Sequence, residues 1–215
     1  MGNVLHFIQA GGIIMIPLLL MSVASVAIIV ERWMTFKQDG DLADGLLKRV
    51  LRLTEDGAFD DAGRACDSRS GPVAACLGAV MRHRQLGVSN VERKVQEVGE
   101  KYFQRLERFL PVLDTTTTIS PLLGLLGTLF GMIGTFQAIS GAKDQNANDR
   151  ILSGVGEALY ATATGLTIAV ICFVAYNYFS SRRRTIVQET EQSVTTLINA
   201  LIAQNQIEER ESLKA

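Results

Sequence analysis

One carboxylate and two hydroxyls lie at helical spacing in the apolar stretch between residues 151 and 181. Glu157 and Thr164 are seven residues apart, so they share one face of a helix, and Thr162 broadens that face. An acidic side chain inside an apolar helix is rare unless it lines a polar cavity or has a partner. The functional interpretation is proton or ion passage. The structural alternatives are an interfacial carboxylate and threonine hydroxyls bonded to their own helix.

The preceding apolar stretch, residues 114–140, carries a second set of polar side chains. Thr128 and Thr135 are seven residues apart and follow Asp114, Thr117 and Pro121 on a broadly shared face. Each hydroxyl supplies one donor and two acceptor lone pairs without adding a charge. We therefore predict a proton pathway, or pore, built from side chains of both stretches: Thr128, Thr135, Glu157, Thr162 and Thr164.

The rest of the composition disfavours several function classes. The chain has 215 residues, 47% of them hydrophobic, and its net charge of −1 lacks the basic excess that nucleic-acid binding requires. His6 and His83 are the only imidazoles, and neither is near a carboxylate or thiol cluster. Cys66, Cys76 and Cys172 have no metal-ligand spacing and are expected to be ordinary buried thiols. We expect no metal, no cofactor and no enzymatic activity.

Three uncharged runs are long enough to cross a bilayer. They cover residues 7–30, 115–142 and 158–181, and a helix rising about 1.5 Å per residue needs about 20 residues for a 30 Å hydrocarbon core. The first run lacks a basic leader and a small-residue cleavage site, so we expect a retained span rather than a signal peptide. The predicted fold class is an all-α integral membrane protein with three transmembrane helices.

The distribution of basic residues predicts the orientation. The segment between the first two spans, Arg32 to Arg108, holds 14 of the 21 basic residues, and Arg182, Arg183 and Arg184 directly follow the third span at the membrane interface. Basic residues stay on the cytoplasmic side. The predicted organisation is an external N-terminus (1–12), a span (13–33), a cytoplasmic helical segment (34–113), a span (114–140), an external connector (141–150), a span (151–181) and a cytoplasmic tail (182–215).

Two of the spans are predicted to extend into the cytoplasm as long amphipathic helices. Ser89 and Glu92 form a capping-box pattern, after which apolar residues recur every three or four positions up to residue 113. No turn signal separates this helix from the second span, and Pro111 and Pro121 are the places where a kink is expected. A similar apolar stripe continues from the third span into the tail.

The segment before this helix, residues 41–84, is predicted to form shorter helices. Asp56-Gly57 and Gly71-Pro72 supply the turn signals between them, and Gly87 is a plausible hinge before the long helix.

Small residues also recur at helical spacing in the second and third spans. Such stripes let helix backbones approach closely in lipid, so we predict tight packing within and between subunits; packing within one subunit alone is the alternative. Thr128, Thr162 and Glu157 are not among the glycines of these stripes, so Thr128→Val, Thr162→Val and Glu157→Ala should leave assembly intact. The stripes consist of Gly124, Gly127, Gly131 and Gly134 in the second span and of Gly154, Ala158, Ala161 and Gly165 in the third.

Two stretches carry a resemblance to a known family. Pro121 to Thr128, continuing through Gly131-Met132-Ile133, and Gly156 to Leu166 look like the two signature stretches of the MotA/TolQ/ExbB proton-channel family. Both occur in the expected order, and three spans resemble the ExbB and TolQ branch rather than MotA. The short N-terminus and the polar run after Asp114 depart from that pattern.

The resemblance implies a homopentamer in the bacterial inner membrane that encloses the transmembrane helices of an ExbD- or TolR-like dimer. Such a complex uses the proton motive force to drive a periplasmic partner such as TonB or TolA. By motif position, Thr128 would be the pore residue of the second span, with Glu157 and Thr162 those of the third. A TolQ-like subunit and a non-conducting scaffold remain the alternatives to an ExbB-like channel.

Overall fold

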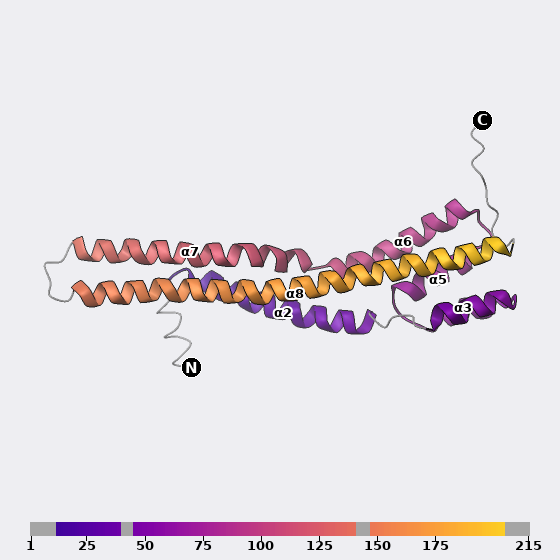
Figure 1. Cartoon of the computed structure of the whole chain (residues 1–215), viewed down its shortest axis with the longest axis horizontal. Coiled ribbons are helices and arrows are strands. Elements are labelled where there is room, and N and C mark those ends of the chain that lie inside the picture. Colours follow the sequence, from indigo (N-terminus) through magenta and orange to yellow (C-terminus); the bar gives the residue numbers. More distant parts are fainter. Residues whose placement is uncertain (1–11, 40–44, 141–146, 205–215) are drawn as a thin grey trace, which may run out of the picture. The chain divides into compact units, whose positions relative to one another are not determined.

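The computed structural model describes residues 12–39, 45–140 and 147–204. Apart from short turns, these residues are α-helical and include no strand, so the predicted all-α class is confirmed. The helices are α2 (Met15–Asp39), α3 (Leu46–Glu55), α4 (Phe59–Asp67), α5 (Pro72–His83), α6 (Val88–Glu107), α7 (Leu110–Ser140) and α8 (Ala147–Ala203) (Figure 1).

Three helical stretches are long and apolar enough to cross a membrane, as the sequence predicts. They lie within Met15–Lys37, Val88–Gln137 and Gly154–Ala203. The predicted first run begins earlier, but residues 7–11 lie outside the described part of the chain. The external connector is likewise described only from residue 147, where α8 already begins. Helix α8 continues without interruption from the third apolar stretch into the tail, as its stripe of apolar residues predicts.

The chain divides into two compact units. Unit 1 combines residues 1–31 with 109–178, and unit 2 combines residues 32–108 with 179–215. Each unit therefore joins segments that are far apart in the sequence. Unit 1 holds most of the apolar stretches, whereas unit 2 holds α3 to α6 and the last part of α8.

Unit 2 is organised around one hydrophobic core. Helices α3, α4, α5, α6 and α8 all contribute buried side chains to it, among them Val50, Leu77, Val91 and Leu197. The predicted turns separate the short helices. Gly57 has φ +74° after α3, and Gly71 has φ +118° immediately before α5, conformations that an L side chain rarely adopts.

The predicted continuous helix into the second span is interrupted. Helix α6 ends at Glu107, Phe109 has φ 66°, and α7 begins at Leu110. The reason is Pro111, whose ring clashes with the carbonyl four residues earlier in an unbroken helix, and that carbonyl belongs to Glu107. The chain therefore breaks just before this proline, whereas Pro121 lies inside α7 without ending it.

The predicted capping box is also wrong. Helix α6 begins one residue before Ser89, its N-cap is Gly87, and no side chain caps it with a hydrogen bond. Gly87 has φ −56° and ψ 155°, an extended conformation open to any residue, so its backbone geometry does not require glycine. Whether it acts as a hinge stays a prediction.

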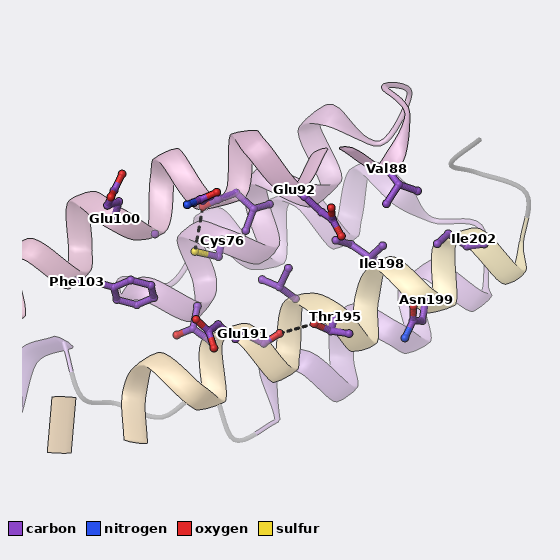
Figure 2. A pocket seen from close by; sticks show the side chains of 15 residues that line it. Cys76, Val88, Glu92, Glu100, Phe103, Glu191, Thr195, Ile198, Asn199 and Ile202 are labelled. Atoms are coloured by element: carbon purple, nitrogen blue, oxygen red, sulfur yellow. Dashed lines mark hydrogen bonds between the residues drawn. The ribbon is translucent and has the colours of Figure 1, made fainter. Parts of the chain in front are cut away.

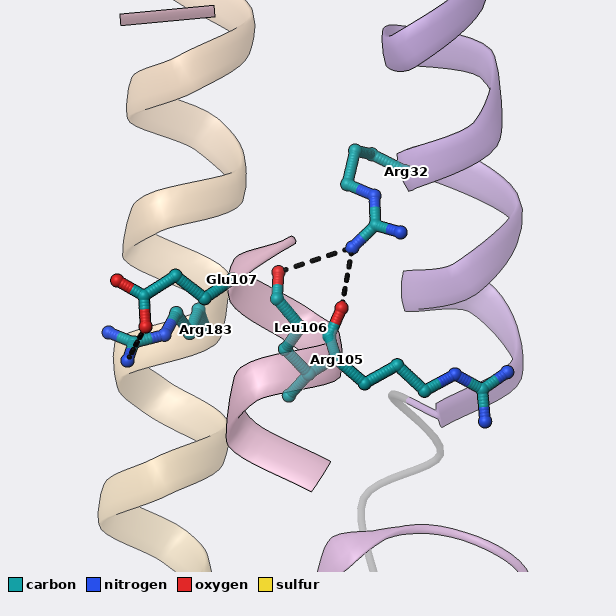
Figure 3. A network of polar contacts seen from close by, with 5 residues as sticks. All are labelled: Arg32, Arg105, Leu106, Glu107 and Arg183. Carbon is teal, nitrogen blue, oxygen red and sulfur yellow. Dashed lines mark hydrogen bonds and ion pairs between the residues drawn. The ribbon is translucent and has the colours of Figure 1, made fainter. Parts of the chain in front are cut away.

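Two arginines hold the C-terminal end of α6 within unit 2 (Figure 3). The Nη1 of Arg32, from α2, donates hydrogen bonds to the carbonyls of Arg105 at 2.7 Å and Leu106 at 3.4 Å. Arg183, from α8, forms a 2.8 Å ion pair with Glu107. The last carbonyls of a helix lack intrahelical donors and carry partial negative charge, so the buried Arg32 side chain, 1% exposed, satisfies and stabilises this end.

Candidate functional site: the paired helices α7 and α8

Helices α7 and α8 contact each other within unit 1 through their small residues. A Cβ added at Gly124 would lie 3.0 Å from the Thr162 Cα and 3.1 Å from the Ala161 carbonyl oxygen. At Gly127 it would lie 2.6 Å from the Ala161 Cβ, closer than real side chains approach. Only residues without a Cβ permit this backbone separation, which is how helices associate in lipid.

The same contact continues in both directions along the pair. A Cβ at Gly131 would lie 3.0 Å from the Ala158 Cβ. Gly154 faces the Thr135 hydroxyl, and Gly165 faces the Ser120 carbonyl so closely that a Cβ at either glycine would collide. Gly134 is different, because nothing lies within 4 Å of the position its Cβ would take.

These distances place both stripes, apart from Gly134, in the α7–α8 contact of a single chain. Packing within one subunit, the alternative interpretation of the stripes, accounts for these contacts. Their participation in contacts between subunits stays a prediction.

Two predicted pore residues lie in that same helix contact. The Thr162 hydroxyl donates to the Gly124 carbonyl at 2.9 Å, across the two helices. Thr135 is buried, donates to the Gly131 carbonyl at 2.7 Å and lies against Gly154. Thr162 thus lies in the packing contact itself, while its pore role, that of Thr135 and the survival of assembly in Thr162→Val stay predictions.

Thr128 and Thr164 are both partly exposed, and the hydroxyl of each bonds to its own helix, as the Thr135 hydroxyl does. Thr128 donates to the Leu125 carbonyl at 2.7 Å, and Thr164 donates to the Tyr160 carbonyl at 2.8 Å. With the hydroxyl hydrogen used in this way, each oxygen keeps lone pairs that accept a hydrogen bond from outside the helix. These two residues are thus placed as acceptors on the surface of the helix pair.

The backbone of Glu157 lies in α8, but its side chain lies outside the described part of the structure. Its predicted role in the proton pathway therefore stays a prediction.

Ser120 is a residue of this site that the sequence analysis passed over. It is fully buried, and its Oγ has no hydrogen-bond partner among the described residues. It precedes Gly124, Gly127 and Gly131 at spacings of four, three and four, so it belongs to the same stripe. This helical spacing is the feature of the sequence from which Ser120 could have been identified as part of the contact.

The basic residues that follow the third apolar stretch differ in their surroundings. Arg183 forms the ion pair with Glu107, whereas Arg184 is exposed and Arg182 is partly buried. Their expected place at a membrane interface stays a prediction.

The three cysteines are free and buried, which confirms the interpretation as ordinary thiols. Burial raises the pKa of the Cys66 thiol and of the Cys76 thiol to about 11. Thiols that stay protonated at neutral pH are poor nucleophiles and poor metal ligands. Among the described residues, no three His, Cys, Asp or Glu side chains are grouped so that they hold a metal ion.

Comparison with known proteins identifies the family. The model of the MotA/TolQ/ExbB proton channel family matches residues 70–192, more than half of the chain and including most of both paired helices. The chain belongs to the MotA/TolQ/ExbB proton channel family. With three helices that are long and apolar enough to cross a membrane, this family member is a multi-pass membrane protein.

Individual relatives agree with this family assignment. The biopolymer transport protein ExbB of Salmonella typhimurium is 30% identical over 182 residues, covering 78% of this chain and 71% of its own length. An ExbB-like biopolymer transport protein of Synechocystis sp. is 29% identical over 185 residues, covering 84% of this chain and 88% of its own. The Tol-Pal system protein TolQ of Haemophilus influenzae is 42% identical over 102 residues, covering 47% of this chain and 44% of its own length.

Proposed function

We propose that this family member is an ExbB-like subunit of a proton channel in the bacterial inner membrane. Five copies form a ring around the transmembrane helices of an ExbD- or TolR-like dimer. Proton passage through the ring drives motion of a TonB-like partner and thereby transport across the outer membrane. The N-terminus and the α7–α8 connection lie on the periplasmic side, while unit 2 lies in the cytoplasm.

One observation carries the proposal: the two stretches that resemble the family's signatures pack against each other and leave hydroxyl acceptors on the outside of the pair. Thr128 and Thr164 have donated their hydrogens inward, at 2.7 and 2.8 Å, so their outward lone pairs are suited to a proton donor on a partner helix. A partner carboxyl that alternates between protonated and ionised states is such a donor. In this proposal Glu157 contributes an acidic group to the same pathway.

Thr135 and Thr162 have a supporting role in this proposal. The Thr162 hydroxyl bonds across the two helices to the Gly124 carbonyl, and Thr135 packs against Gly154, so both residues help to set the separation of the pair. The arginine run after the third span would sit at the cytoplasmic lipid surface, where cationic side chains are retained.

The proposal is tested by complementation in two bacterial hosts, one lacking its own ExbB and the other lacking its own TolQ. Each host receives this chain together with a gene for an ExbD- or TolR-like partner. Restored TonB-dependent uptake that disappears when an uncoupler collapses the proton gradient supports the ExbB-like assignment. Restored envelope integrity in the second host alone supports the TolQ-like alternative. A folded complex that shows no gradient-dependent activity in either host favours a scaffold.

A further inference from the structure

A groove of about 420 Å³ runs along unit 2 between α6 and the last part of α8, and its lining includes Cys76 from α5 (Figure 2). Its volume falls within the range of about 300–1,000 Å³ that is typical of binding pockets. The lining includes apolar side chains from both long helices, such as Val95 and Phe103 on α6 and Val194 and Ile198 on α8. The groove therefore offers an apolar surface along two helices.

The charged residues that line this groove are all acidic. Among its fifteen lining residues, Glu92 and Glu100 on α6 and Glu191 on α8 are the only charged ones (Figure 2). All three are exposed, and within the described part of the chain none of their carboxylates forms an ion pair. An apolar surface with acidic neighbours is complementary to a helix edge that carries apolar and cationic side chains side by side.

The chain's own C-terminal segment does not have that chemistry. Residues 205–215 begin shortly after Ile202, at the end of the groove's α8 side, but they contain three Glu, one Arg and one Lys, a net charge of −1. Like charges disfavour this segment as the occupant.

A complementary edge exists elsewhere in unit 2, on α3. Lys48, Arg49 and Arg52 are exposed, and within the described residues none of them forms an ion pair. Leu47 and Leu51 lie beside them and are only partly buried. Residues four apart lie on one helix face, so the leucines and the cations form two adjacent stripes along α3.

We propose that the groove of one subunit receives the α3 edge of a second copy of this chain. The cations on α3 then pair with the carboxylates of the groove, while the leucines cover its apolar side chains. Because the two surfaces differ, the contact is head-to-tail, so each added copy presents a free groove or a free α3 edge to the next until the ring closes. This inference rests on the proposed homo-oligomer and assigns the unit 2 surfaces that hold it together.

The first test fills the groove. Thr195 is exposed and lines the groove, whereas Thr196 is exposed and does not line it; both hydroxyls bond to their own helix, at 2.9 and 2.8 Å. The full chain carrying Thr195→Trp should lose the ring in native mass spectrometry in detergent, while the Thr196→Trp control should keep it. Circular dichroism checks that both variants retain their helix content. Equal ring yield in the two variants overturns the proposal.

The second test exchanges charges and does not depend on a bulky side chain. Glu191→Arg and Arg52→Glu should each shift the population from rings to monomers by about tenfold or more. Combining them in one chain should restore the ring, because each contact again joins opposite charges. Gln192→Arg is the matched control, since Gln192 is exposed beside Glu191 and does not line the groove. Failure of the double variant to recover, while the control forms rings, contradicts direct pairing.

The two proposals fail in distinguishable ways. Rings that respond to these substitutions in a chain without gradient-dependent activity would support the contact and refute the proposed function. Rings that persist in Thr195→Trp while coupling activity is lost would assign the groove to a different protein and refute the contact.

Discussion

The hydroxyl of Thr162 donates a hydrogen bond to the carbonyl oxygen of Gly124 at 2.9 Å, across the contact between α8 and α7. The glycine makes this bond possible, because its Cα carries no side chain between the two backbones. One pair of residues thus combines close backbone packing with a polar contact in an apolar environment.

Thr162→Val should destabilise the α7–α8 pair by about 0.6 kcal/mol and at most about 1.7 kcal/mol, the average and the maximum for hydrogen bonds between membrane helices. The substitution keeps the shape of the side chain and removes the donor. Thermal unfolding of the full chain in detergent measures the change. Thr167→Val is the control, because its hydroxyl bonds at 2.8 Å to Ala163 of its own helix. Equal shifts in both variants would show that the interhelical bond adds no net stability.

Gly127→Ala should reduce the yield of folded protein, because the added Cβ would lie 2.6 Å from the Ala161 Cβ and force the helices apart. Gly134→Ala, where nothing lies within 4 Å, should be neutral or stabilising by up to about 1 kcal/mol, the gain from higher helix propensity. Size-exclusion chromatography and thermal unfolding compare the two variants. A fully folded Gly127→Ala subunit that merely fails to oligomerise would contradict the intrachain role of this glycine.

Arg32→Met should loosen the end of α6. The Arg105 and Leu106 carbonyls would lose a shared cationic donor, and a hydrogen bond to a charged group contributes about 1.5–3 kcal/mol. Hydrogen exchange should speed up in the last turn of α6, around residues 104–108. Lys37→Met is the control on the same helix, since Lys37 is exposed. Unchanged exchange in Arg32→Met would mean that the arginine does not stabilise this helix end.

Cys66 and Cys76 should resist alkylation in the native protein at pH 7 to 9. Burial raises both pKa values to about 11 from 9.0, so the folded protein holds these protons more tightly than the unfolded chain. Their contribution to stability is therefore complete below pH 9 and is lost as the pH rises through about 11. Maleimide labelling, with exposed Thr196→Cys as the reactive reference, measures protection. Labelling of Cys66 and Cys76 as fast as the exposed cysteine of Thr196→Cys would contradict this protection.

Thr128→Val should slow gradient-driven coupling about tenfold or more. Removing the acceptor leaves a proton-carrying group in the pathway without a partner, which costs about 1–3 kcal/mol. Thr115→Val is the matched control on α7, because Thr115 is exposed and its hydroxyl also bonds to its own helix, at 2.8 Å. The measurement is proton-gradient-dependent uptake in cells, normalised to ring yield. Identical activity in the two variants would make Thr128 a structural residue.

The sequence predicted the local features of the fold because they depend on neighbouring residues. The three apolar stretches follow from composition, and the turns at Gly57 and Gly71 follow from backbone conformations that favour glycine. Pro111 is one of the two positions where the sequence predicts a kink, and the chain breaks there instead of bending. Periodicity continues through that position, and only the steric requirement of the proline ring at the Glu107 carbonyl places the break at Phe109.

By itself, the sequence determined the all-α class, the apolar stretches and the stripes of small residues, since each is a property of length, composition or spacing. Tertiary structure alone decided which partners these residues meet. Thr162 bonds to a carbonyl 38 residues away, and Arg32 bonds to one 73 residues away. Periodicity places a side chain on one face of its helix, but the residue opposite depends on how separate helices pack. For this reason, the sequence left open that Thr162 bonds to Gly124, and the groove between α6 and α8 had no signature in the sequence.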